Sequence, residues 1–335
     1  MGGEARLGSE SERSRATFIL KNVTANTQFS IICAIFGLIV LFSILSPYFL
    51  SLNNMLNIGQ YASIMGILAI GETMALLTGG FDISIAAVAA FCGMVTAIFI
   101  QTFEQPLGIS IFMGLLAGAG AGAVNAFIHT GLKINPLITT LSTMSIFRSL
   151  AFIVNEGKTV TITNDAFLEI GRSSILGIPS CFFFMIILMI VMGYVLMQTG
   201  FGRKLYCIGG NKYASFLSGI NITRTKFIMF ILIGIFSGFA GILMASQTGA
   251  GLSSAAMGME MNVIAAAILG GVSLAGGKGN MQGTFLGVFL LAMIQNGMVM
   301  INVQSYYQNL VKGIILVVSV YIDVLRNGQD DVKAQ

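Results

Sequence analysis

Ten long apolar runs are the feature that most constrains the fold of this chain. They cover residues 29–45, 58–78, 83–102, 107–129, 136–154, 176–199, 227–247, 259–274, 283–301 and 307–325. A bilayer-spanning helix needs about 20 mostly apolar residues, so ten spans with short connections use nearly all of the 335 residues. Only 9% of the residues are charged, against about 25% in soluble domains. The sequence predicts an all-α integral membrane protein with about ten transmembrane helices.

The distribution of Lys and Arg predicts the orientation. One set of alternate loops, together with both termini, holds thirteen of these residues, whereas the opposite loops hold only Lys158 and Arg172. Basic residues collect on the cytoplasmic side of membrane proteins. We therefore expect a cytoplasmic N-terminal tail (1–28) without a removable signal peptide, a polytopic domain (29–325) and a cytoplasmic C-terminal tail (326–335).

Glycines at four-residue spacing predict close contacts between the helices, because small residues let two helix backbones approach in lipid. The repeats are Gly114, Gly118 and Gly122, then Gly234 and Gly238, then Gly283 and Gly287. The four cysteines have no metal-like spacing, and the single histidine, His129, cannot form a metal site or a triad alone. The sequence predicts no catalytic residue and no metal site.

A polar segment at residues 200–226 interrupts the apolar pattern. It carries five basic residues and no acidic one, and it is longer than the 2–8 residues that usually join two helices. Residues 212–218 are expected to form a short helix that Gly219 ends. Such a helix suits contact with another protein, whereas the charge alone also suits a loop beside anionic lipid. The residues leave both interpretations open.

Several motifs resemble, in order, the membrane permeases of ribose-type ABC sugar importers. In the polar segment the matching residues are Gly202-Arg203, Tyr206, Gly209-Gly210-Asn211 and Ser218-Gly219-Ile220. Other matching stretches are GGFDIS at 79–84, residues 135–148, LGIP at 176–179, AILGGVSLAGGKGNMQGTFLG at 267–287 and SYYQNLVKG at 305–313. The resemblance covers nearly the whole chain from about residue 30. Phe81 and Ile85-Ala86-Ala87 depart from the family pattern, which leaves the particular sugar undetermined.

The resemblance implies a multi-pass permease of the bacterial inner membrane, which forms the pathway for a pentose, hexose or related sugar or polyol. Its implied partners are an ABC ATPase, an extracytoplasmic sugar-binding protein and a second permease copy, identical or closely related, in contact with membrane lipid but not nucleic acid. Residues 200–226 would be the ATPase-coupling segment, with Gly202, Arg203, Gly209, Gly210, Asn211, Ser218 and Gly219 as coupling residues. The extracytoplasmic loop at 155–175 is either a docking surface for the binding protein or an ordinary solvated loop.

The chain itself shows no nucleotide-binding motif. GGKGN at 276–280 lacks the upstream glycine and the following Ser or Thr of a phosphate-binding loop. We therefore expect no cofactor on this chain, with ATP and Mg²⁺ bound by the partner ATPase.

Polar side chains within spans are costly in a bilayer and serve as functional hypotheses. The candidates for the pathway or for structural bonds are Glu72, Asp82, Asn125, Arg148, Gln295 and Asn296. We expect Asp82 to cap the helix that follows it, in either a tight turn or a broken helix, and Glu72 to pair with Arg148 or Lys312. The three amides either contact sugar hydroxyls or join neighbouring helices. The alternative function is an ion-coupled secondary carrier, in which Glu72 and Asp82 would be the coupling sites.

Overall fold

The computed structural model describes residues 27–333, and helices dominate the fold. In this part of the chain eight helices are long and apolar enough to cross a membrane. They are α2 (Thr27–Leu45), α3 (Leu52–Leu77), α5 (Leu107–Ala126, continued by the π-helical turn η1, Phe127–Gly131), α6 (Pro136–Ile153), α8 (Ser180–Gln198), α11 (Ile222–Thr248), α13 (Met281–Met300) and α14 (Ser305–Lys333). Two shorter apolar helices are α4 (Ile85–Gln101) and α12 (Met259–Leu269). The predicted tail at 1–28 lies almost entirely outside the described residues.

Each predicted span overlaps one of these helices, but several boundaries differ. Helix α3 begins six residues earlier than predicted, where the Ser51 hydroxyl accepts from the Asn54 N–H, and α11 begins at Ile222, after Asn221. Both first turns are polar, so the apolar run alone does not reveal them. Helix α12 ends at Leu269 rather than at residue 274, and its 11 residues cover about 17 Å at 1.5 Å per residue. It is shorter than the roughly 30 Å hydrocarbon core.

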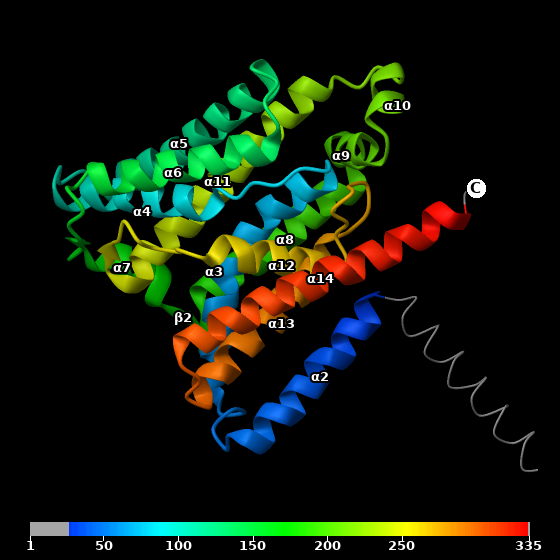
Figure 1. Cartoon of the computed structure of the whole chain (residues 1–335). Coiled ribbons are helices and arrows are strands. Elements are labelled where there is room, and N and C mark those ends of the chain that lie inside the picture. Colours follow the sequence, from blue (N-terminus) through cyan, green and yellow to red (C-terminus); the bar gives the residue numbers. More distant parts are fainter. Residues whose placement is uncertain (1–26, 334–335) are drawn as a thin grey trace, which may run out of the picture.

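Helix α3 forms the centre of the molecule and packs against α8, α11, α12 and α13. Figure 1 shows it passing between the other helices, with α2 and α14 at the outside. The α3 side chains from Ala62 to Leu77 are all buried, whereas many apolar side chains of α2 and α14 are exposed. An apolar surface of this kind is expected where helices face lipid.

The predicted close helix contacts are present. Gly118 and Gly122 of α5 lie directly on the backbone of α11 at Gly234 and Phe230, so that neither position has room for a Cβ atom. On the other side of the molecule Gly287 of α13 lies in the same way on Ala266 of α12, and Gly283 lies on Gly270, directly after α12. Four-residue glycine spacing in the sequence therefore marks the α5–α11 and α12–α13 interfaces.

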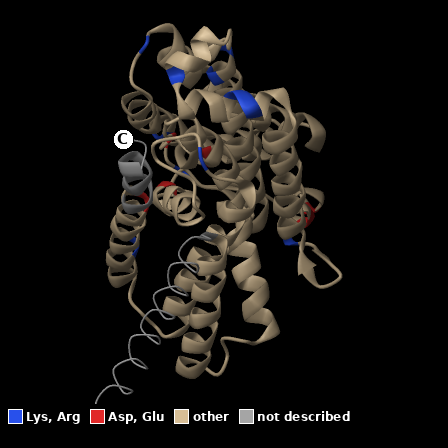
Figure 2. Ribbon diagram, turned by 90° about the vertical axis from the view of Figure 1, so that its right-hand side faces the viewer, with Lys and Arg blue, Asp and Glu red and all other residues tan. Residues whose placement is uncertain are grey.

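The segments that connect the helices differ between the two ends of the bundle. One end carries α9 (Gly200–Gly210) and α10 (Lys212–Leu217); the other carries α7 (Asp165–Arg172) and short antiparallel strand pairs, β1 (Val160–Thr161) with β4 (Ala250–Gly251) and β2 (Ser174–Ile175) with β3 (Ile178–Pro179). Figure 1 shows α7 and α10 at opposite ends. Figure 2 shows Lys and Arg gathered at its top, where α10 lies, in agreement with a cytoplasmic position for this end.

Candidate functional site

The predicted coupling segment is two helices rather than a helix preceded by a loop. Helix α9 begins after Thr199, whose hydroxyl accepts from the Gly202 N–H at 3.3 Å. Gly202 packs so closely on the α8 backbone at Leu196 that a side chain would not fit, whereas Arg203 is exposed. We missed α9 in the sequence because its glycines at both ends indicate a loop.

Helix α10 matches the prediction. The Asn211 side chain accepts from the Ala214 N–H at 2.9 Å and begins the helix. The Ser218 hydroxyl donates to the Ala214 carbonyl at 2.9 Å, and Gly219 follows with φ of +77°, a conformation that ends helices and favours glycine. The helix presents Tyr213, Phe216 and Leu217, each about two-thirds exposed or more. These exposed apolar side chains lie at the end of the bundle that is rich in Lys and Arg.

The end of α9 lies on the connection between α3 and α4 and on the GGKGN turn. The backbone of Gly209 touches the Leu77 carbonyl, and a Cβ on Gly276 would lie 2.8 Å from the Gly79 nitrogen. The Gly277 N–H donates to the Leu77 carbonyl at 2.9 Å. We call these five residues, Leu77, Gly79, Gly209, Gly276 and Gly277, the glycine junction. It joins three segments that are far apart in the sequence.

Tyr206 adds a side-chain contact to the same place. Its hydroxyl donates to the Gly279 carbonyl at 2.8 Å, which holds the GGKGN turn against α9. Partial burial raises the pKa of Tyr206 above its ordinary value, so the phenol stays protonated at neutral pH and remains a donor. Helix α9 is therefore in contact with both the GGKGN turn and the end of α3.

The connection beyond the junction carries a buried polar cluster of Glu72, Asp82, Ser84 and Asn125. The Asp82 N–H donates to Glu72 Oε2 at 3.2 Å. The Ser84 N–H and hydroxyl both donate to Asp82 Oδ1. Asn125 Nδ2 donates to Ser84 Oγ at 2.8 Å and to Asp82 Oδ2 at 3.4 Å. The cluster ties α3, the tight turn after it and α5 together.

Two predictions about this cluster are wrong. Asp82 does not cap α4: the N-cap position is Ser84, and the carboxylate instead accepts from Ser84 within the turn. Glu72 does not pair with Arg148, which donates to the Ser253 and Ala255 carbonyls at 2.9 and 2.7 Å. A guanidinium reaching two carbonyls of an irregular segment holds that segment in place before α12.

The remaining predicted amides also join helices. Asn296 of α13 and Asn54 of α3 exchange two hydrogen bonds, each 2.9 Å long. Gln295 Nε2 donates to Gln308 Oε1 of α14 at 2.5 Å. Like Asn125, these side chains donate to polar groups of other segments, although the amide oxygens of Asn125 and Gln295 are buried without a partner among the described residues. Lys312, the other predicted partner of Glu72, lines a separate small cavity beside Tyr61.

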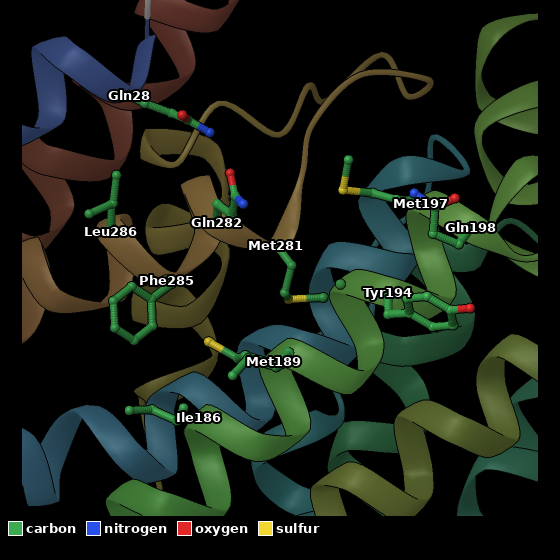
Figure 3. Close-up of a pocket in the computed structure, with 12 residues that line it drawn as sticks. Gln28, Ile186, Met189, Tyr194, Met197, Gln198, Met281, Gln282, Phe285 and Leu286 are labelled. Carbon is green, nitrogen blue, oxygen red and sulfur yellow. The ribbon is translucent and has the colours of Figure 1, made fainter.

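A cavity of about 620 Å³ lies between α2, α8 and α13. Figure 3 shows Met189, Met281 and Phe285 pointing into it, with the amides of Gln28 and Gln282 on one side. None of the described residues that line it is acidic or basic. The sequence does not reveal this cavity because its lining residues come from three separate helices and form no motif.

The buried helical bundle, the basic end and the helix pair that rests on its interior define a multi-pass permease. The chain belongs to the family described as branched-chain amino acid transport system / permease component, whose model matches residues 54–320. It is a multi-pass protein of the inner membrane. No solved structure matches it.

Named relatives cover most of the chain. It is 39% identical over 295 residues to the L-arabinose transport system permease protein AraH of Escherichia coli, covering 86% of this chain and 90% of the relative. It is 37% identical over 291 residues to the ribose import permease protein RbsC of Bacillus subtilis, with the same coverage. The corresponding protein of Haemophilus influenzae is 33% identical over 316 residues, covering 91% of this chain and 98% of the relative.

Proposed function

We propose that this chain is the permease subunit of an ATP-driven ABC importer and forms the pathway for a sugar or a related polyol. The carrying observation is the similarity, over about nine-tenths of the relatives' length, to permeases named for ribose and for L-arabinose. The family description names branched-chain amino acids, but relatives at 33–39% identity are named for sugars. The nearer evidence therefore favours a pentose-like substrate.

We infer that ATP and Mg²⁺ are bound by a separate ATPase, and that an extracytoplasmic binding protein and a second permease copy complete the importer. The exposed Tyr213, Phe216 and Leu217 of α10 suit the ATPase contact. At the other end, α7 and the exposed residues 156–159 form a polar surface that suits the binding protein.

The glycine junction supports a mechanism in which the ATPase acts through α9. When the ATPase moves α10 and α9, the backbone contacts of Gly209 displace the end of α3 and the turn that carries Asp82. ATP shifts this equilibrium only as far as the ATPase binds one arrangement of the helices better than the other. A junction of backbone atoms suits this role because close-packed groups do not absorb the displacement by rotamer changes.

We propose that the cavity between α2, α8 and α13 contacts the sugar in the cytoplasmic half of the pathway. Amides such as Gln28 and Gln282 can bond sugar hydroxyls, and Phe285 offers an apolar face for a sugar ring. The amides predicted from the sequence are less suitable because the protein already engages them.

Uptake into proteoliposomes tests the proposed substrate. Vesicles carrying the chain and its ATPase, with internal ATP and external binding protein, are assayed with labelled ribose, L-arabinose and leucine. We expect saturable uptake of at least one of the two pentoses and none of leucine. Uptake of leucine alone would contradict the sugar assignment and favour the family description.

A further inference from the structure

A second cavity, of about 630 Å³, lies at the cytoplasmic end between η1, α10 and the beginning of α11. Among the described residues its lining contains His129, Lys133, Lys212 and Lys226 and no acidic residue. These basic residues come from three segments, so the fold, rather than a charge run in the sequence, brings them together. The cavity is distinct from the glycine junction and from the cavity proposed to contact the sugar.

Within the described part of the chain, no carboxylate neutralises the basic side chains of this cavity. Lys226 is only 8% exposed, and its Nζ lies 3.4 Å from His129 Nε2. The salt bridge between Lys158 and Glu156 lies at the opposite end of the molecule. A buried ammonium without a carboxylate is costly, and a bound anion would remove that cost.

The backbone at the start of α11 also attracts an anion to this cavity. Ile222 and Thr223, the first residues of the 27-residue helix α11, line the cavity. The first N–H groups of a helix have no partner within the helix and attract anions, phosphate in particular. Asn221 accepts from only one of them, the Arg224 N–H. The lysines and the start of α11 therefore both attract an anion to the same cavity.

The position of the cavity indicates where the anion comes from. The cavity lies where two apolar spans, Leu107–Gly131 and Ile222–Thr248, reach their basic ends. This is the level of the lipid headgroups, where basic pockets between helices bind anionic lipid. Exposed Phe216 lies at the cavity and offers an apolar contact beside the charges.

We propose that this cavity binds the phosphate of an anionic phospholipid from the cytoplasmic leaflet. The site is additional to sugar import and does not depend on it. A bound headgroup would join α10, which carries the proposed ATPase contact, to the ends of α5 and α11. The same phosphate chemistry could be supplied by inorganic phosphate, and the test separates the two sources.

The test is native mass spectrometry of the purified, delipidated chain titrated with phosphatidylglycerol or with zwitterionic phosphatidylcholine. We expect preferential retention of phosphatidylglycerol, weakened about fivefold by Lys212→Gln and again by Lys226→Gln. Arg224→Gln is the matched control, because it removes an exposed charge on the same turn outside the cavity. Exposed Lys212 keeps the test usable should the buried Lys226 variant fail to fold.

Equal retention of both lipids, or equal loss in the Arg224→Gln control, would overturn the proposal. Inorganic phosphate is added in a separate arm. Displacement of phosphatidylglycerol by phosphate at comparable concentration would assign the site to the soluble anion and refute the lipid source. Retention of the lipid in the presence of phosphate supports it.

Discussion

Adjacent glycines at the end of α9 offer a direct test of the glycine junction. A Cβ on Gly209 would collide with the Leu77 carbonyl and the Gly277 nitrogen, whereas a Cβ on Gly210 would meet nothing within 4 Å. Neither glycine has a positive φ, so alanine is conformationally acceptable at both positions. Gly209→Ala and Gly210→Ala therefore differ in packing alone.

The expected cost of Gly209→Ala follows from these contacts. Extra volume against fixed backbone costs about 1–3 kcal/mol, and separating Gly277 from Leu77 sacrifices a hydrogen bond worth roughly 1 kcal/mol. Alanine in place of glycine returns up to about 1 kcal/mol through helix propensity. The net destabilisation is about 1–3 kcal/mol, whereas Gly210→Ala is neutral or slightly stabilising.

Thermal unfolding in detergent and ATP-driven sugar uptake measure the two consequences. We expect Gly209→Ala to lower the unfolding midpoint by several degrees and to reduce uptake per ATP hydrolysed. Gly210→Ala keeps the wild-type midpoint. If the two variants have equal midpoints and equal uptake per ATP, α9 does not act through the glycine junction.

Three further substitutions test other parts of the account. Asn54→Leu leaves the Asn296 amide without its reciprocal partner and should cost about 1–3 kcal/mol of stability. The loss is measured as a lowered unfolding midpoint, which adding Asn296→Leu should partly restore. An unchanged midpoint in Asn54→Leu would refute the pair. Arg148→Met removes both bonds to the segment before α12 and should increase amide hydrogen exchange there, whereas unchanged exchange would show that the segment is held by other contacts. Glu72→Gln keeps an acceptor for the Asp82 N–H and should leave uptake ATP-driven; abolished uptake with a normal midpoint would favour the ion-coupled carrier.

The apolar pattern predicts the helices well because lipid requires long apolar runs. Predicted and observed limits agree within a few residues in the middle of the chain, as for α6, predicted at 136–154 and found at Pro136–Ile153. The errors fall where a helix leaves the apolar layer. The polar first turns of α3 and α11 and the glycine-bounded α9 are helical through caps and packing, which hydropathy does not register.

The candidate site was less predictable. The coupling motif located Gly209, Gly210 and Asn211, but not the contact of Gly209 with Leu77, because sequence spacing does not show which distant backbones meet. The partners predicted for Glu72 and Arg148 were wrong for a related reason. Opposite charges suggest a pair, yet each of these side chains bonds instead to backbone groups of an irregular segment.

The source of energy for uptake tests the central claim most directly. Sugar uptake is measured in proteoliposomes containing the chain, its ATPase and its binding protein, with internal ATP or with an imposed proton or sodium gradient. We expect uptake that requires ATP and the binding protein and that is lost when Gly209-Gly210-Asn211 is replaced. Uptake driven by an ion gradient, without ATP or binding protein, would contradict it.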